Sequence, residues 1–298
     1  MDLRQLRYFV TVAEEGSVTR AAERLHIAQQ SLSQQIRSLE AELGAPLFER
    51  SSRGVALTDV GAVLLREGRP VLAQTERAVE AARRAARGEG SVLRVGFLSS
   101  VANYMLPPIV RAFRARHPEV TLHVEDASIA MLVERLRAGE LDAGVSRPPL
   151  VEDLETEVVL REPVAAVLPA GHPLATREQL ALAELADEPW VLTPRASWPP
   201  WHRKYDEDYA RAGFRPRVVQ RATTPQNLLA LVAAGVGVTR LPLSSRTLRD
   251  SGVSFVPLTD DEAEVVVVWR PTNRNPAVAA LRALVRDVAH MTDPVAAG

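Results

Sequence analysis

Cysteine is absent from all 298 residues. Disulfides, cysteine nucleophiles and cysteine-bound zinc are therefore excluded, and the chain suits a reducing compartment. The sequence also lacks any run of about 18 apolar residues, which argues against a membrane-spanning helix. Its first residues contain no apolar stretch followed by a small-residue cleavage site, so they do not predict a signal peptide. We therefore expect a cytoplasmic protein with no membrane partner.

The short motifs of common enzyme classes are also missing. GxxxxGK[ST], HExxH and GxSxG do not occur, and the six histidines are scattered. We therefore expect no enzyme, no cofactor and no metal site. Charge is balanced, with 36 basic and 37 acidic side chains, so no argument for nucleic-acid binding can rest on a basic chain. Lysine occurs once, as Lys204, beside 35 arginines, which is typical of a GC-rich genome.

Two short amphipathic helices joined by a turn are predicted between Val18 and Leu43. Each carries an apolar residue every three or four positions. These stripes are Val18, Ala21, Ala22 and Leu25 in the first helix, and Leu32, Ile36, Leu39 and Leu43 in the second. Ser17 is suited to cap the first helix, Gly44 to end the second, and Ile27 to fill the corner between them. The spacing predicts a helix-turn-helix.

The second helix has a polar face opposite its apolar stripe. Its side chains can form hydrogen bonds with base edges or phosphates, as a recognition helix requires. They are Gln29, Gln30, Ser31, Ser33, Gln34 and Arg37. The plainer alternative is a pair of packed helices with a solvated polar face.

A helix before this pair and a β-hairpin after it complete the pattern. The helix carries Leu3, Leu6, Phe9, Val10 and Ala13. Residues 47–50 and 55–57 are predicted strands around a turn at 51–54, a wing with Arg50 and Arg53 at its tip. Residues 1–58 contain seven arginines and seven acids, but phosphate contacts need only local clustering of basic groups.

Residues 1–58 resemble the DNA-binding domain of the LysR-type transcriptional regulators. The resemblance rests on LRYFVTVAEEGSVTRAAERL, AQQSLSQQIRSLEAELGAPLFER and SRGVALTDVG. Gln30 and Val18 depart from the residues more common in the family; the first could alter base preference, and neither affects the fold. The resemblance implies an all-α winged helix-turn-helix that binds double-stranded DNA at a promoter dyad. It also implies a homodimer or homotetramer and contact with RNA polymerase.

A long helix is predicted from Asp59 to about Arg87. It carries too few apolar residues to be stable alone. The resemblance implies that residues 59–90 form a linker helix and hinge through which the DNA-binding domains dimerise. The apolar residues are Val60, Val63, Leu64, Val71, Leu72 and Val79. Gly68 and Pro70 interrupt the pattern, so we expect a bend there.

From residue 91 to 298, strands alternate with helices, as in parallel α/β folds. The predicted strands are 92–98, 120–125, 141–145, 164–168, 190–193, 217–221, 236–241, 254–258 and 264–269, and the helices are 103–116, 128–138, 201–212, 225–234 and 276–290. GFLSS, LRAGELDAGV, GHPLA and LVAAGVGVTRLP resemble the family's two-lobed effector domain, which is similar to periplasmic solute-binding proteins. Lobe I would comprise about 91–161 and 266–298, and lobe II about 162–265, with crossings near 161–163 and 263–265.

A ligand of such a fold is expected in the cleft between the lobes. Hydroxyls at predicted helix starts suit a small carboxylate or other anionic metabolite. The candidate effector contacts are Ser99, Ser100, Ser128, Arg147, Trp201 and Thr224. Each hydroxyl has the alternative role of a helix cap, Arg147 that of an exposed ion-pair partner, and Trp201 that of a packed surface residue.

Two other functions fit parts of the sequence. A solute-binding or carrier protein would use the second region and oligomerise through the first, but it would need an export signal. A nucleoid-type DNA binder would not need a ligand-binding fold. We therefore predict a transcriptional regulator that responds to a small molecule.

Overall fold

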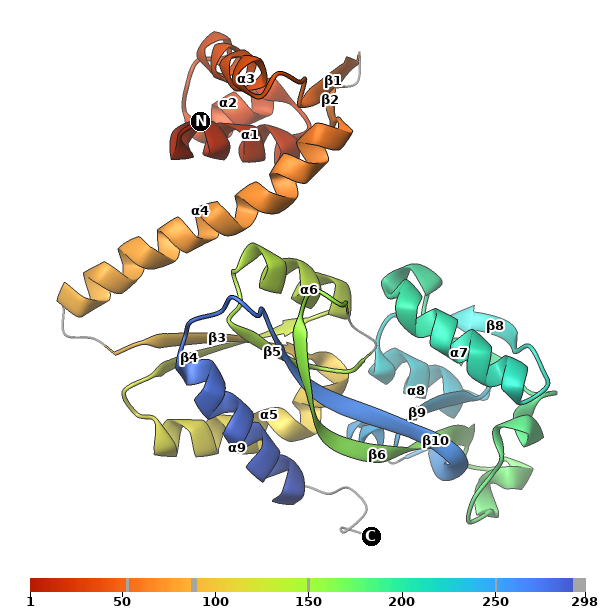
Figure 1. Cartoon of the computed structure of the whole chain (residues 1–298). Coiled ribbons are helices and arrows are strands. Elements are labelled where there is room, and N and C mark those ends of the chain that lie inside the picture. Colours follow the sequence, from red (N-terminus) through yellow and green to blue (C-terminus); the bar gives the residue numbers. More distant parts are fainter. Residues whose placement is uncertain (52–53, 87–89, 149–150, 250, 292–298) are drawn as a thin grey trace. The chain divides into compact units, whose positions relative to one another are not determined.

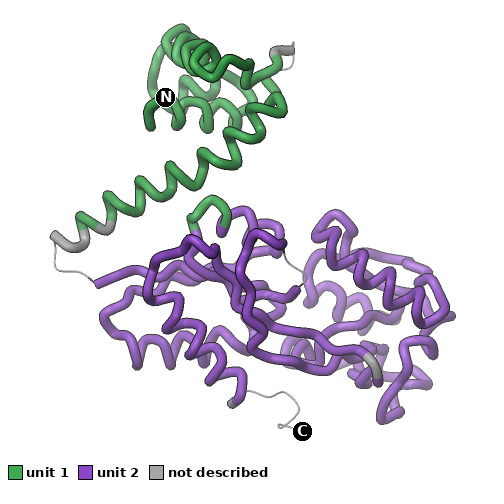
Figure 2. The backbone as a smooth tube through the Cα atoms, in the orientation of Figure 1, with its two compact units in different colours: residues 1–89, 137–140 green, residues 90–136, 141–298 purple. Residues whose placement is uncertain are grey.

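The computed structural model describes residues 1–51, 54–86, 90–148, 151–249 and 251–291. The chain divides into two compact units: residues 1–89 with 137–140, and residues 90–136 with 141–298 (Figure 2). Among the described residues, no helix is both long enough and apolar enough to cross a membrane.

The first unit begins with three helices, α1 (Leu3–Glu15), α2 (Val18–Leu25) and α3 (Gln29–Leu43) (Figure 1). Ser17 caps α2 by accepting a hydrogen bond from the Arg20 amide, and Gly44 ends α3 in the left-handed conformation. Both predicted boundaries are confirmed. The core includes Leu6, Phe9, Val10, Ala21, Ala22, Leu32, Ile36 and Leu39, with Ile27 packed against it. Leu3 and Leu43, which belong to the predicted apolar sides of α1 and α3, each lie in a terminal turn and are exposed.

The helix-turn-helix is followed by the predicted wing and linker helix. Strands β1 (Phe48–Ser51) and β2 (Gly54–Leu57) pair antiparallel. Helix α4 (Asp59–Ala86) continues through Pro70, so the proline does not end it. The apolar residues Val60, Val63, Val71 and Val79 on α4 are exposed.

A six-stranded sheet runs through the second unit in the order β4-β3-β5-β10-β6-β9. Its strands are β3 (Val92–Leu98), β4 (Thr121–Ala127), β5 (Ala143–Ser146), β6 (Glu155–Pro169), β9 (Thr239–Pro242) and β10 (Val253–Trp269). Only β3 with β4 and β3 with β5 pair in parallel. The remaining pairs are antiparallel.

The predicted crossings near 161–163 and 263–265 lie within two long strands. Strands β6 and β10 run through both positions and pair along their length, from Val253 opposite Pro169 to Trp269 opposite Glu155 (Figure 1). The two lobes therefore share two continuous strands.

Each lobe has its own apolar core. In the first, α5 (Ser99–Arg116) and α9 (Ala277–Met291) pack against one face of the sheet around Phe97, and α6 (Ile129–Ala138) covers the other. In the second, β7 (Pro189–Leu192) and β8 (Arg217–Arg221) pair in parallel beside α7 (Pro199–Arg211) and α8 (Pro225–Ala233), with Trp190 buried among them. Short 3₁₀ helices occupy Pro173–Thr176, Leu182–Leu185, Arg195–Ser197 and Leu243–Leu248.

Candidate functional site

The polar face of α3 is open to solvent. Gln29, Gln30, Ser31, Gln34 and Arg37 are exposed, and Ser33 is half-buried. No hydrogen bond or ion pair joins any of these six side chains to another described residue, while Leu32, Ile36 and Leu39 fill the core behind them. Their donors and acceptors are therefore available to a partner along one helical ridge.

Hydrogen bonds join the residues at the base of the wing to both neighbouring helices. Glu40 of α3 accepts a hydrogen bond at Oε1 from the Leu47 amide, at 2.9 Å. The Leu47 carbonyl in turn accepts from the Thr58 amide at 3.1 Å. A side chain at Gly61 would place its Cβ 2.2 Å from the same carbonyl oxygen. The end of α3, the base of the wing and the start of α4 thus form one hydrogen-bonded unit.

The side chains of the two arginines predicted at the wing tip lie outside the described residues. The backbone of Arg50 belongs to β1, but its side chain lies outside the described residues, and Arg53 lies outside them entirely. Near its turn, the wing is anchored to the α1–α2 connection by the Val55 amide, which donates to the Gly16 carbonyl at 3.1 Å.

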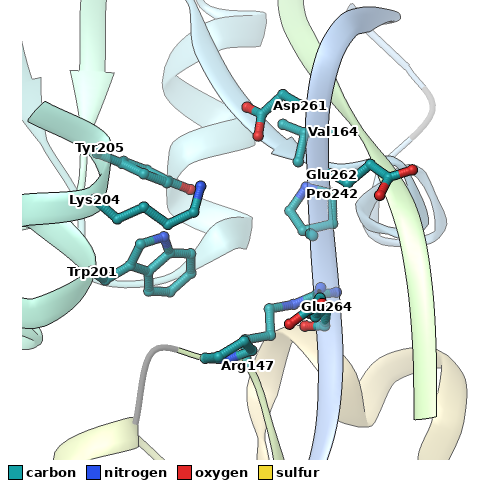
Figure 3. A pocket seen from close by; sticks show the side chains of 11 residues that line it. Arg147, Val164, Trp201, Lys204, Tyr205, Pro242, Asp261, Glu262 and Glu264 are labelled. Carbon is teal, nitrogen blue, oxygen red and sulfur yellow. Dashed lines mark hydrogen bonds between the residues drawn. The ribbon is translucent and has the colours of Figure 1, made fainter. Parts of the chain in front are cut away.

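A cavity of about 400 Å³ opens in the second unit between α7 and β10 (Figure 3). Side chains from both lobes line it. They are Arg147, Pro148, Val164, Trp201, Lys204, Tyr205, Pro242, Asp261, Glu262, Ala263 and Glu264. Its walls combine apolar surface with a few charges, as in sites for small molecules.

Arg147 enters this cavity from the end of β5 as part of a buried ion pair. Its side chain is 2% exposed and lies 2.6 Å from the Glu162 carboxylate, which is 0% exposed. Tyr104 and the Ser244 amide also donate to Glu162, each at 2.9 Å. Burial raises the pKa of Tyr104, which keeps its hydroxyl protonated as a donor. The alternative of an exposed ion pair is therefore wrong, because both charges are enclosed.

A second buried network lies behind the opposite wall. Arg240, whose side chain is 1% exposed, reaches Asp208 at 2.6 Å and Asp261 at 2.9 Å, and its guanidinium lies 3.8 Å from the centre of the Tyr205 ring. Lys204 contacts Asp208 at 3.1 Å. Burial raises the pKa of Asp261. Burial also acts to raise the pKa of Asp208, but the hydrogen bond and charge of Arg240 outweigh it and the net shift is downward.

Of the six predicted effector contacts, the cavity brings together Arg147 and Trp201. Ser99 and Ser100 do not precede a helix but form its first two residues, and Ser99 donates to Asp126 at 2.8 Å. Ser128 and Thr224 cap helices by accepting from the amides of Met131 and Asn227. None of these four hydroxyl residues lines the cavity described above.

Sequence reasoning missed much of the charged lining. Asp261 and Glu262 fell in what was predicted to be a connection, and Tyr205 in the middle of a helix. Lys204 had a compositional signal, as the single lysine in the chain. The acids had no such signal, because a strand irregularity that no local pattern predicts brings them to the cavity.

Comparison with known proteins assigns both units. Residues 3–62 match the family model described as a bacterial regulatory helix-turn-helix protein of the lysR family, and residues 86–290 match the LysR substrate binding domain. The chain is 38% identical to the transcriptional regulator AlsR of Bacillus subtilis over 281 residues, which covers 93% of each protein.

Two solved structures are similar to this chain over nearly its whole length. The crystal structure of CbnR, a LysR family transcriptional regulator, has a TM-score of 0.71 at 28% identity and covers 97% of this chain and 99% of that one. Full-length CbnR in complex with its target DNA also has a TM-score of 0.71, at 29% identity, and covers 97% of this chain and 100% of that one.

Proposed function

The chain belongs to the LysR family of DNA-binding transcriptional regulators, and we propose that a small carboxylate or other anionic metabolite is its effector, bound in the cavity beside Arg147 and Trp201. The observation that carries the proposal is the exposed polar ridge on α3 together with a cavity in the effector unit that residues of both lobes line. The regulator would act in the cytoplasm as a homodimer or homotetramer and communicate with RNA polymerase.

The ridge on α3 supports a specific set of DNA contacts. Gln29, Gln30, Ser31, Ser33, Gln34 and Arg37 would reach base edges and phosphates, with Arg50 and Arg53 on the adjacent backbone. Glutamine suits adenine and arginine suits guanine in the major groove. In a dimer, two such helices would occupy successive grooves of a promoter dyad.

Substitution of Gln34 tests the base contacts. Gln34→Ala should lower the ratio of affinities for the cognate site and random DNA by about fivefold to 150-fold, since one good base contact is worth about 1–3 kcal/mol of discrimination. The DNA is the intergenic region beside the protein's own gene, measured by fluorescence anisotropy. Arg4→Ala, at an exposed position on α1, is the control. An unchanged ratio for Gln34→Ala would remove this residue from base recognition.

The cavity supports an effector role because its walls come from both lobes. A ligand there would favour one relative position of the lobes, and this preference is what a change in DNA binding requires. Arg147 and Lys204 supply positive charge, and Trp201 supplies an aromatic wall. Ser99, Ser100, Ser128 and Thr224 stay as predicted contacts outside this lining.

Ligand-induced thermal stabilisation of the full chain tests the effector role. A panel of acetate, succinate and benzoate, each titrated to millimolar concentration, should include at least one compound that raises the melting temperature and changes promoter binding. Trp201→Ala should reduce that rise, whereas Arg203→Met, an exposed neighbour on α7, should not. An undiminished rise in Trp201→Ala would place the ligand elsewhere.

A further inference from the structure

The charges that line the cavity do not favour a ligand that carries only negative charge. Two cations, Arg147 and Lys204, face three acids, Asp261, Glu262 and Glu264. A carboxylate alone would approach a lining with more acids than bases. The chemistry of the acidic wall therefore bears on which effector fits the site.

On the basic side, Lys204 is the cation most available to a ligand. The charge of Arg147 is already met by Glu162, which also accepts hydrogen bonds from Tyr104 and Ser244. Lys204 also contacts a carboxylate, that of Asp208 at 3.1 Å, but its side chain is about half exposed and points its ammonium into the cavity (Figure 3). It is also the single lysine beside 35 arginines. A compact ammonium with three donors can hold a carboxylate in a space too narrow for a guanidinium fork.

On the acidic side, an irregularity in β10 brings two consecutive carboxylates to the cavity. Neighbouring residues of a regular strand point to opposite faces. Between Pro257 and Glu262 the pairing with β6 shifts, and extra residues on β10 redirect the side chains. Asp261 and Glu262 both line the cavity as a result.

These two carboxylates retain capacity for a donor. The Oδ2 atom of Asp261 is buried and lies near Arg240, yet no hydrogen bond of good geometry reaches it. Glu262 is exposed and forms no ion pair within the described part of the chain. Glu264 differs, because Arg161 holds it at 2.8 Å. An ammonium group on a ligand would satisfy Asp261 and Glu262 at once.

The remaining residues that line the cavity determine the size and polarity of the uncharged part of the ligand. Trp201, Pro148, Val164, Pro242 and Ala263 present apolar surface. A cavity of about 400 Å³ accommodates a molecule the size of an amino acid with its side chain, but not a large cofactor.

We propose that the effector is a zwitterion, an α-amino acid with an apolar side chain. Its carboxylate binds Lys204, its ammonium group binds Asp261 and Glu262, and its side chain packs on Trp201. This inference rests on the proposed function of the cavity as the effector site, and it restricts the class of carboxylate that the site accepts.

Calorimetric titration of the full-length protein tests the proposal. The twenty common L-amino acids are screened first. The tightest is then compared with two analogues of the same side chain, the acid that lacks the amine and the amine that lacks the carboxylate. L-phenylalanine, for example, is matched by 3-phenylpropionate and 2-phenylethylamine. The amino acid should bind at least about tenfold more tightly than either analogue, because each analogue leaves a charged group of the site without its partner.

Three variants assign the two ends of the ligand. Lys204→Met should remove the preference for the amino acid over the amine that lacks a carboxylate. Asp261→Asn should remove the preference for the amino acid over the acid that lacks an amine. Arg203→Met and Asp187→Asn are exposed controls in the same lobe and should bind like the wild type. If Asp261→Asn unfolds through loss of its contact with Arg240, the exposed Glu262→Gln makes the same comparison without a buried charge.

The outcomes separate this inference from the proposed function. If the acid without the amine binds as tightly as the amino acid, the zwitterion is wrong and an anionic effector stands. The same conclusion follows if no amino acid binds while a carboxylate of the earlier panel does. If neither amino acids nor carboxylates bind, both proposals fail.

Discussion

The two units of the molecule differ in where their charged side chains lie. In the DNA-binding unit, ion pairs such as Arg7 with Glu76 lie at the surface, and the core is almost wholly apolar. In the effector unit, Arg147 and Glu162 are enclosed as a pair, and Arg240 is enclosed with Asp208. Both networks adjoin the cavity or its wall.

This difference is consistent with what we propose that each unit binds. A surface that meets DNA keeps its polar groups solvated until the duplex replaces the water. A cavity that recognises a charged metabolite must hold charges in fixed positions out of water, and each of these charges needs a partner. Substitution of a charge should therefore have a large effect on the stability of the second unit and a small effect on that of the first.

The largest effect is expected for Arg240→Met. Removal of this guanidinium leaves Asp208 and Asp261 buried with less compensation, and should lower the free energy of unfolding of the effector unit by about 3–5 kcal/mol. Urea denaturation followed by circular dichroism measures the unfolding of both units. The matched substitution in the first unit, Arg24→Met, removes exposed pairs with Glu14 and Glu15 and should leave the transition where it is. Equal shifts for both variants would contradict the comparison.

A smaller effect on stability is expected for Glu40→Ala, which removes the side chain that joins α3 to the wing. The Leu47 amide would lose its acceptor, at a cost of about 1–3 kcal/mol, and affinity for cognate and random DNA should fall together because the wing moves. Glu40→Gln keeps an oxygen acceptor and should retain most of the stability and most of the affinity for DNA. Anisotropy titrations beside thermal melts measure the two effects. Normal DNA affinity in Glu40→Ala would show that the wing does not depend on this bond.

Ser128→Ala should cost about 1 kcal/mol, because its hydroxyl caps α6. Thermal melts with and without a bound effector separate the cap from a ligand contact. A cost that is the same in both conditions belongs to the cap alone. A cost that grows when the effector is present would establish the contact predicted from the sequence.

The smallest effect concerns pH. Because burial raises the pKa of Asp261, the folded protein holds this proton more tightly than the unfolded chain does. The contribution of the protonated group to stability is present at low pH and is lost as pH rises through the unfolded and then the folded pKa. The melting temperature of the wild type should therefore fall relative to that of Asp261→Asn as the pH rises above the ordinary pKa of an aspartate, about 4. The opposite trend would mean that Arg240 outweighs burial, as it does at Asp208.

Local patterns in the sequence determined the DNA-binding unit. Apolar residues at helical spacing, a serine before α2 and a glycine after α3 were enough to predict three helices and their order, because caps and stripes act within a few residues. The same patterns predicted most helices of the effector unit. They also identified Arg147 and Trp201 as candidates for the cavity, although not the contacts that hold them.

Tertiary structure decided how the charges of the effector unit are arranged. Arg147 meets Glu162, and Lys204 and Asp261 line the same cavity, only because β6 and β10 pair on both sides of a register shift between Pro257 and Glu262. Strand pairing joins residues far apart in the chain, so no short stretch of sequence encodes it. Ion pairs also depend on burial, which the fold alone determines.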